Sequence, residues 1–151
     1  MAPEKGRLVG KGHPAGDFLE AYEWKVLERG PGFLKVEAHV PDHVRNPRGQ
    51  LFGGFTPTYV DLISLFASRT SPNAPPASDS APQWLATTNM RVDYFDPVIG
   101  PRFHLEARIV RERGRTVMIE TRFVDPADGT LLVFALTTLR RVARANKLGD
   151  A

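Results

Sequence analysis

The sequence predicts an α+β fold in which one long central helix is wrapped by a curved antiparallel sheet of five to six strands. Apolar residues recur at helical spacing in one segment, residues 55–66. Segments in which apolar and polar residues alternate follow it, separated by turn residues. A helix with one apolar face and a meander of strands bury their apolar surfaces best when the sheet curves around the helix.

The chain before the helix is expected to contribute a turn and a strand. Residues 1–13, rich in Gly, Lys and Pro, are predicted to be poorly ordered, and residues 18–28 to form a strand or an irregular segment. Gly30-Pro31-Gly32 is a strong turn signal. The domain is expected to span residues 14–143, followed by a basic tail at residues 144–151. A half-buried strand is predicted after the turn from the alternating residues Leu34, Val36, Ala38 and Val40.

Residues 46–68 are the most informative stretch, because they indicate a loop, a Gly-Gly turn and then a helix. Gly49, Gly53 and Gly54 leave the backbone free to bend or to let another group approach closely. The helix is predicted to start near Gly54, with Pro57 in or near its first turn, where a missing N–H costs little. Asp61 lies on the other side from the apolar face, which comprises Phe55, Tyr59, Leu62, Ile63 and Phe66.

A flexible loop and then four strands are expected after the helix. Residues 70–82 carry prolines and small polar side chains that prevent a regular element. The breaks between strands are Asp96-Pro97 with Gly100-Pro101, the hairpin at Arg113-Gly114 and the hairpin at Asp128-Gly129. Each strand is predicted from one alternating set of mainly apolar residues. The four sets are Met90, Val92 and Tyr94, then Phe103, Leu105, Ala107 and Ile109, then Val117, Ile119, Thr121 and Phe123, and finally Leu132, Phe134, Leu136 and Thr138, continuing to about Val142.

Composition indicates an ordinary soluble globular protein of one domain. The chain has 151 residues, of which 42% are apolar and 25% charged, and a net charge of +3. The absence of cysteine excludes disulfides, thiolate catalysis and Cys-ligated zinc. No membrane-spanning run or targeting signal is visible, so a cytoplasmic location is expected. The histidines match no metal-ligand spacing and are interpreted as surface or strand residues: His13, His39, His43 and His104.

The start of the helix and Asp61 together predict a site that binds a carbonyl group and attacks it. A helix that begins with glycines presents free N–H donors and the positive end of its dipole. A carboxylate two turns along the same helix is suitably placed beside whatever those donors bind. The alternatives are that Asp61 belongs to the polar side of an amphipathic helix, that Asn46 merely starts a turn, and that Thr87 is an ordinary strand residue.

These residues resemble the hotdog-fold acyl-CoA thioesterases of the phenylacetate-pathway, or PaaI-like, group. The resemblance covers nearly the whole domain, from about Pro14 to Val142. The family pattern is Asn-Pro-x-Gly, a His-Gly-Gly-like turn, and an acidic residue about seven positions into the helix. Residues 94–98 and the arginine-rich turn at 111–115 also look like family features. The matching residues are Asn46, Pro47, Gly49, Gly53, Gly54 and Asp61.

The resemblance implies hydrolysis of an acyl-CoA between two subunits of a homodimer, or of a homotetramer built as a dimer of dimers. The Gly54 N–H would polarise the thioester carbonyl, and Asp61 of the neighbouring subunit would act as nucleophile or general base. Asn46 would position water or substrate, and Thr87 would orient the attacking water. No metal or other cofactor is implied, since coenzyme A enters as part of the substrate.

Phe52 departs from the family pattern, because the family commonly has His directly before the Gly-Gly turn. That His usually supports the carbonyl site by hydrogen bonding, so its loss bears on rate and substrate but leaves the carboxylate and the backbone donor. Phe52 and Gly53 are expected to line the substrate site. Arg113 and Arg115 are expected to bind the phosphates of coenzyme A. The alternative for this arginine-rich turn is a solvated hairpin.

Three rival functions stay open at the level of sequence. A hotdog protein that binds acyl-CoA without hydrolysing it, as a sensor or carrier, is favoured by Phe52 and disfavoured by Asp61. A hydratase or dehydratase usually needs a catalytic His paired with a carboxylate, and no His lies near the Gly-Gly turn. A nucleic-acid-binding domain has only the basic residues near the C-terminus in its favour, without aromatic residues interleaved among them. We therefore expect neither nucleic acid nor a membrane as partner.

Overall fold

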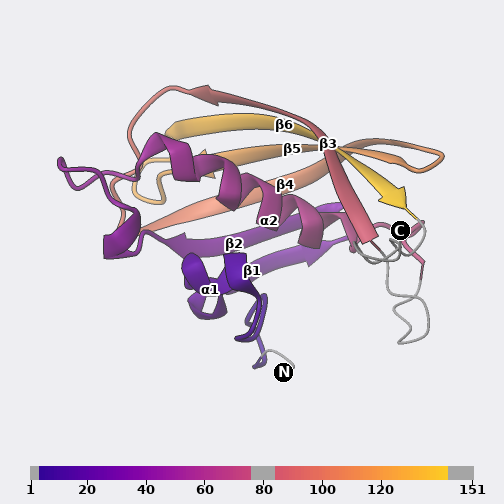
Figure 1. The fold of residues 1–151 in the computed structure, drawn as a ribbon, viewed down its shortest axis with the longest axis horizontal. Helices are drawn as coiled ribbons and strands as arrows, with labels where there is room; N and C mark the ends of the chain where they lie inside the picture. Colours follow the sequence, from indigo (N-terminus) through magenta and orange to yellow (C-terminus); the bar gives the residue numbers. More distant parts are fainter. Residues whose placement is uncertain (1–3, 76–83, 143–151) are drawn as a thin grey trace, which may run out of the picture.

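The computed structural model describes residues 4–75 and 84–142. Over these residues the chain forms a six-stranded antiparallel sheet that curves around one long helix, α2 at Thr56–Ser68 (Figure 1). The other elements, in chain order, are the helix α1 at Pro14–Phe18, the 3₁₀ turn η1 at Ala21–Glu23, the strands β1 at Lys25–Gly30 and β2 at Phe33–His39, the 3₁₀ turns η2 at Asp42–Val44 and η3 at Gly53–Phe55, and, after α2, the strands β3 at Trp84–Tyr94, β4 at Arg102–Arg113, β5 at Thr116–Val124 and β6 at Leu131–Val142.

The sheet has the strand order β1-β2-β4-β5-β6-β3, and every neighbouring pair is antiparallel. β3 follows α2 in the chain but pairs with β6, so β1 and β3 form the two edges of the sheet. Helix α2 packs against β2, β3, β4, β5 and β6 inside the curve (Figure 1). The predicted α+β hotdog arrangement, a central helix wrapped by a curved antiparallel sheet, is therefore confirmed.

Helix α2 is held by its apolar face. Pro57 lies in its first turn, where its missing N–H leaves no helical bond unmade. Fully burying one large apolar side chain contributes about 1.5–3 kcal/mol, so packing against the sheet stabilises α2 more than its own propensity does. The face it buries includes Tyr59, Val60, Leu62, Ile63 and Ala67, with Phe55 and Phe66 partly buried beside them.

Tyr59 is at the centre of an aromatic cluster between α2 and the sheet. Its ring stacks on Trp24 with 5.5 Å between ring centroids, and it meets Phe103 and Phe123 edge-on at 5.4 and 6.0 Å. Its hydroxyl donates to the carbonyl oxygen of His39 at 2.8 Å, which satisfies its polar atom. Burial raises the pKa of Tyr59. The cluster fixes how α2 lies on the sheet and thereby sets the direction of the opposite helix face.

Beyond Leu132, which is buried as predicted, β6 buries the opposite set of side chains from the predicted one, which corrects that expectation. Both phases of this strand carry apolar residues, so alternation alone does not decide which set faces α2. The phase with the larger residues faces outward, where the Arg122 guanidinium lies over the Phe134 ring, 5.7 Å from its centroid. The buried residues are Val133, Ala135, Thr137 and Leu139, whereas Phe134, Leu136 and Thr138 are half-buried.

The N-terminal segment contacts the domain within residues 4–13, although its composition predicts little order. Arg7 forms an antiparallel bridge with Lys25 of β1, and its side chain donates to the Glu23 carbonyl. Leu8 is only 4% exposed, so the few apolar residues of this segment supply the contact that composition understates. The segment predicted as a strand or irregular region at residues 18–28 is divided between the end of α1, η1 and β1.

The loop after α2 is described only as far as residue 75. Hydrogen bonds from Thr70 to Ala67 and from Ala74 to Ser71 form its first turns. The rest of the predicted loop, residues 76–82, and the predicted basic tail at 144–151 lie outside the described residues, as do residues 1–3. Among the described helices, none is long and apolar enough to cross a membrane.

Candidate active site

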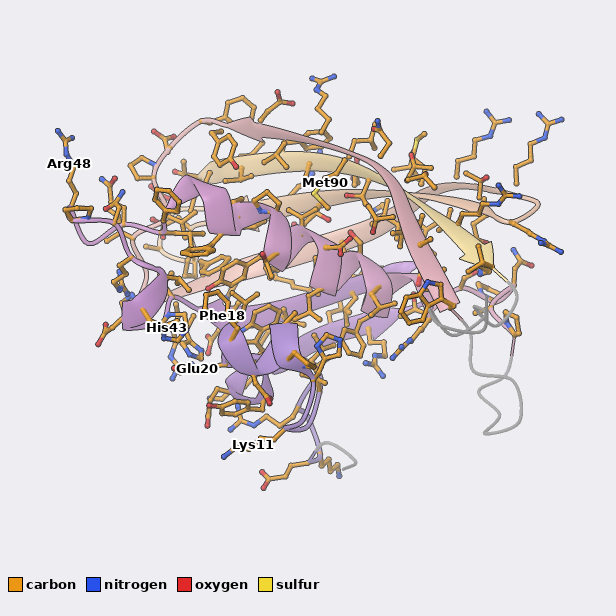
Figure 2. The ribbon with its side chains drawn as sticks, in the orientation of Figure 1. Lys11, Phe18, Glu20, His43, Arg48 and Met90 are labelled. Carbon is orange, nitrogen blue, oxygen red and sulfur yellow. The ribbon has the colours of Figure 1, made fainter. Side chains whose placement is uncertain are left out.

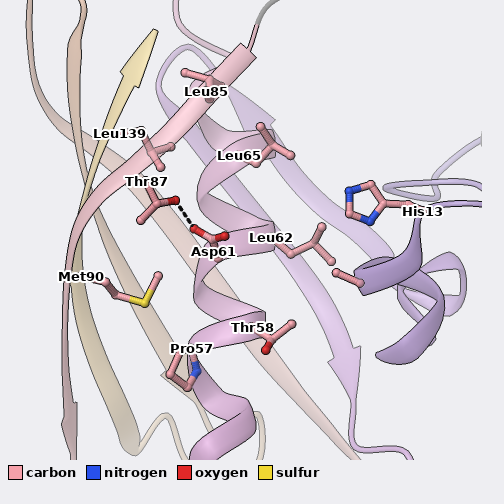
Figure 3. A pocket seen from close by; sticks show the side chains of 11 residues that line it. His13, Pro57, Thr58, Asp61, Leu62, Leu65, Leu85, Thr87, Met90 and Leu139 are labelled. Carbon is pink, nitrogen blue, oxygen red and sulfur yellow. Dashed lines mark hydrogen bonds between the residues drawn. The ribbon is translucent and has the colours of Figure 1, made fainter. Parts of the chain in front are cut away.

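Asp61 and Thr87 meet on the side of α2 that faces away from the aromatic cluster. The Oγ1 hydroxyl of Thr87, on β3, donates to Oδ1 of Asp61 with 2.5 Å between the oxygens (Figure 3). Both residues are exposed in the single chain. A hydrogen bond to a carboxylate is among the stronger ones in proteins. It fixes one carboxylate oxygen and leaves Oδ2 of Asp61 without a partner among the described residues.

A β-bulge determines which side chains β3 presents to α2. The pairing of β3 with β6 shifts between Thr87 and Asn89. Leu85 and Thr87 share a face because they are two positions apart. Met90 reaches the same pocket because the extra residue of the bulge changes the alternation. Met90 points from β3 toward α2 (Figures 2 and 3).

The pocket beside Asp61 has a volume of about 390 Å³. It lies over α2, between β3 on one side and the N-terminal segment that carries His13 on the other (Figure 3). Its size and its mainly apolar walls suit a small apolar group next to the carboxylate. The polar side chains that line it are His13, Thr58, Asp61 and Thr87, and the apolar ones include Leu62, Leu65, Leu85, Met90 and Leu139.

The Gly-Gly turn lies within η3, directly before α2. Both glycines are exposed, and neither Gly53 nor Gly54 donates its N–H to a backbone carbonyl of a described residue. The Tyr94 hydroxyl donates to the Gly53 carbonyl at 2.7 Å. An added Cβ would lie 3.6 Å from the Tyr94 ring at Gly53, and 2.7 Å from the Phe52 ring at Gly54. The contact at Gly54 is thus with an exposed ring, and Gly54 has no left-handed φ.

Gly54 and Asp61 are separated along one chain. About two helical turns correspond to roughly 10 Å along the axis. The 3₁₀ geometry of η3 adds to this distance, because its rise per residue is larger. A carbonyl bound by the Gly54 N–H is therefore out of direct contact with Asp61 of the same chain. This separation fits the expectation that the two groups act from different subunits.

Asn46 closes the loop that precedes the Gly-Gly turn. Its Oδ1 accepts from the backbone N–H groups of Arg48 and Gln50 at 2.9 and 3.0 Å. Gly49 in this loop has φ +75°, a conformation that favours glycine. Arg48 lies at the tip of the loop, at the far end of the molecule (Figure 2). The structure thus shows the turn-forming role of Asn46, and its role toward substrate stays a prediction.

Phe52, Arg113 and Arg115 lie away from the Asp61 pocket in the single chain. Phe52 is 51% exposed and packs edge-on against Phe55 at 5.5 Å between centroids. Arg113 and Arg115 are exposed on the hairpin between β4 and β5, at the opposite end of the sheet from the Gly-Gly turn (Figure 1). Their expected contacts with substrate therefore stay predictions that need a second subunit or an extended ligand.

Three residues at these sites had no role in the sequence-based hypothesis. Arg45 donates to the carbonyls of Gly49, Ile99 and Val40, which holds the Asn46 loop against the segment before β4. Tyr94 was predicted as a strand position at the start of the family-like segment 94–98, without a role of its own, and His13 only as a surface or strand residue. Contacts to backbone carbonyls leave no pattern in a sequence, so no local signal indicated the roles of Arg45 and Tyr94, and His13 is placed at the pocket only by the fold. Among the described residues, no group of His, Asp and Glu side chains is arranged to hold a metal ion.

The family model of the thioesterase superfamily matches residues 48–132, which include the Gly-Gly turn, Asp61 and Thr87. The chain belongs to this superfamily. This match, together with the similar solved structures described below, confirms the predicted resemblance to PaaI-like hotdog thioesterases. A comparison with the curated proteins finds no match for this thioesterase-superfamily chain.

Solved structures with the same fold include several thioesterases. Zebrafish thioesterase superfamily member 2 is 23% identical, with a TM-score of 0.70 over 87% of each chain. A mutant of the phenylacetic acid degradation protein PaaI from Thermus thermophilus is 27% identical, with a TM-score of 0.66, over 83% of this chain and 99% of that one. A hypothetical thioesterase from Streptococcus pneumoniae, solved with coenzyme A, is 14% identical, with a TM-score of 0.68, over 82% of this chain and 89% of that one.

Proposed function

We propose that this protein hydrolyses the thioester bond of an acyl-CoA and releases the free acid and coenzyme A. The observation that carries this proposal is the hydrogen bond from Thr87 to Asp61 beside an apolar pocket. A fixed carboxylate next to such a pocket suits a base that acts on a thioester whose acyl group fills the pocket. Membership of the thioesterase superfamily and the coenzyme A in the Streptococcus pneumoniae structure support the substrate class.

In the proposed reaction, Asp61 accepts a proton from water as the water oxygen attacks the thioester carbonyl carbon. The Gly54 N–H of the other subunit donates to the carbonyl oxygen as it becomes negative, which contributes about 2.7–4 kcal/mol in comparable sites. The C–S bond then breaks, and coenzyme A leaves as a thiolate that takes up the proton from Asp61. Direct attack by the Asp61 carboxylate is the alternative chemistry for the same site.

The remaining residues have supporting roles in this proposal. Thr87 orients the Asp61 carboxylate and the attacking water, and Asn46 keeps the loop before the Gly-Gly turn in place for water or substrate. Gly53 and Phe52 border the carbonyl site, and the two hairpin arginines contact the phosphates. The assembly is a homodimer or a dimer of such dimers, and the cytoplasm is the proposed location.

A panel of short, medium, long and aromatic acyl-CoAs, assayed for thiol release, tests the proposal. We expect Asp61→Asn to lower kcat on the best substrate by at least about 100-fold, which is the lower range for loss of a general base. Asp128→Asn, in the exposed hairpin between β5 and β6, is the matched control and should keep wild-type kcat. A folded Asp61→Asn protein with near wild-type turnover would show that Asp61 is structural.

Binding without hydrolysis is the second candidate function. The observation that favours it is Phe52, whose exposed ring lies against the Gly-Gly turn where the family commonly places a hydrogen-bonding His. Tight binding of acyl-CoA by isothermal titration calorimetry, with no thiol release from any member of the panel, would support this function over hydrolysis.

A further inference from the structure

His13 forms the side of the pocket opposite β3. It precedes α1, is half-buried, and lines the same pocket as Asp61. Its ring points from the N-terminal segment toward the ridge of α2 that carries Leu62 and Leu65 (Figure 3). An acyl group lying over this ridge therefore has Asp61 and Thr87 on one side and His13 on the other.

One hydrogen bond determines the tautomer of His13. The backbone N–H of Gly16 donates to Nδ1 of His13 at 3.0 Å and caps the start of α1. A backbone N–H can only donate, so Nδ1 must carry its lone pair. The neutral imidazole then carries its hydrogen on Nε2. Nε2 has no partner among the described residues, so it is a donor available to the pocket.

The position of α1, and hence of His13, is fixed by contacts with the sequence around η2. The Phe18 ring meets the His43 ring edge-on at 5.0 Å, and Nε2 of His43 donates to the Phe18 carbonyl. Phe18 also packs against Phe55 near the start of α2, at 5.3 Å between centroids. Phe18 and His43 lie next to each other, below the start of α2 in the view of Figure 2. His13 is therefore carried by a helix that is anchored to α2, which defines the width of the pocket.

The wall around His13 is apolar. Leu62 and Leu65 lie next to it on α2, while Thr58 and Asp61 are the polar residues of that helix in the pocket. A purely hydrocarbon acyl group that displaces water from Nε2 leaves this N–H unpaired, which is unfavourable. An acyl group with an oxygen at this point restores the hydrogen bond.

We propose that His13 is a specificity-determining residue that selects acyl groups carrying a hydrogen-bond acceptor remote from the thioester. The acceptor is a keto, ether or hydroxyl oxygen on an otherwise apolar chain or ring, and it receives the Nε2–H of His13. This inference rests on the proposed function, because it places the acyl group of the substrate in the pocket beside Asp61.

The test compares hexanoyl-CoA with its analogues that carry a keto oxygen on the fourth or the fifth carbon. We expect kcat/KM of the wild-type protein to favour at least one keto analogue by about tenfold, a modest factor because His13 is only half-buried and keeps part of its water. His13→Asn should reduce the preference to near unity, because Asn still caps Gly16 but is too short to present the Nε2 donor. His104→Asn, on the face of β4 opposite the buried Phe103 and Leu105, should leave the preference unchanged.

Dissociation constants of the same acyl-CoAs for the Asp61→Asn protein separate this inference from the proposed function. If no acyl-CoA is hydrolysed but the keto analogue still binds about tenfold more tightly and His13→Asn abolishes the difference, hydrolysis fails and the His13 inference stands. If hexanoyl-CoA is hydrolysed and bound as well as both keto analogues, or if the preference survives His13→Asn, the inference is wrong while hydrolysis stands.

Discussion

The Thr87 hydroxyl determines how the Asp61 carboxylate is presented. A carboxylate at the middle of a helix can adopt several rotamers, and most point it into solvent. The bond from Thr87 holds Oδ1 against β3, so that Oδ2 is the oxygen available to a water molecule.

Removing this donor should slow the chemical step. We expect Thr87→Val, which keeps the shape of the side chain, to lower kcat by about tenfold and to change KM little, because the carboxylate becomes misoriented but the pocket keeps its size. Thr87→Ser retains the hydroxyl and should keep most of the activity. Steady-state kinetics on the best acyl-CoA measure both; equal losses in the Val and Ser variants would indicate packing instead.

Tyr94 acts on the same peptide unit as the proposed oxyanion donor. The Gly53 carbonyl that accepts the Tyr94 hydroxyl and the Gly54 N–H belong to one peptide group. A hydrogen bond at the carbonyl polarises and orients that group, so its N–H becomes a better donor. Tyr94→Phe keeps the ring against Gly53 and removes only the hydroxyl.

We therefore expect Tyr94→Phe to lower kcat by roughly three- to tenfold while KM stays close to the wild-type value, since the donor matters most when charge develops on the carbonyl oxygen. Tyr22→Phe, on η1 and outside the residues that line the pocket, is the control and should leave kcat unchanged. A rise in KM with constant kcat in Tyr94→Phe would mean that the hydroxyl serves ground-state binding only.

The sequence predicts the residues of this site that belong to a pattern, and misses those that act through single contacts. Asp61 was identifiable because it follows a glycine turn on an amphipathic helix, and Thr87 was named from the family resemblance. Their contact could not be read from the chain, because it depends on the bulge after Thr87 and on α2 lying across β3. His13 and Tyr94 reach the site from outside the helix, so their roles appear only in the folded structure.

At the scale of elements, a polar cluster ties the loop after α2 to the ends of β4 and β6. Glu112 accepts from Arg141 at 2.8 Å, from Ser71 at 2.7 Å and from Asn73 at 2.8 Å. The side chains of Arg141 and Glu112 are only 12% and 14% exposed. Burial by itself raises the pKa of Glu112, but the hydrogen bonds from Arg141, Asn73 and Ser71 outweigh it, so the pKa is lowered from its usual value of 4.5.

This lowered pKa predicts an acid-dependent stability. Since the folded protein binds the Glu112 proton less tightly than the unfolded chain does, the cluster stabilises the fold above about pH 4.5 and loses its contribution as pH falls through the lower folded value. We expect Glu112→Gln to reduce the free energy of unfolding by about 2 kcal/mol at pH 7, because Arg141 loses its charged partner. The difference from wild type should shrink near pH 3 in urea unfolding. An equal difference at both pH values would assign the loss to packing.

Sequence periodicity predicts some of the helices and strands correctly and fails for others. α2, β2, β4 and β5 follow their periodicities, because each has a single apolar face. β6 does not, because Phe134 and Leu136 on its outer face compete with Val133 and Ala135 on its inner face. α1 was missed because its five residues are too short for a helical period and depend on the His13 cap and on contacts to Phe55 and His43.

At the scale of the whole molecule, β3 is an edge strand with large apolar side chains. Trp84 and Tyr94 at its two ends are 57% and 53% exposed, and Phe95 beyond it is 59% exposed. An unprotected edge with such side chains favours pairing with another chain. Together with the separation of Gly54 from Asp61, this predicts an obligate homodimer.

Sedimentation at micromolar concentration should therefore show a dimer or a tetramer, with no stable monomer. Trp84→Glu should weaken the assembly and thermal stability together, because it places a charge on the proposed interface. Val110→Glu changes a residue of similar exposure, 52%, on β4 and should remain at least dimeric. A monodisperse, folded and fully active monomer would contradict the two-subunit site.

The arginines of the hairpin between β4 and β5 lie away from the pocket beside Asp61. Because Arg113 and Arg115 are exposed and lie at the opposite end of the sheet from the Gly-Gly turn, they can meet a substrate only through its long nucleotide portion, in the assembled protein. Charges of this kind act at a distance that salt limits to about 8–10 Å, so they should affect KM and its salt dependence rather than kcat.

We expect replacement of both arginines by Gln to raise KM for acyl-CoA and to leave KM for the matching acyl-pantetheine thioester unchanged, since the latter lacks the nucleotide phosphates. Arg29→Gln on β1 is a control for loss of an exposed charge. Equal effects on the two thioesters, or none on either, would indicate that the hairpin is solvated and does not contact the nucleotide.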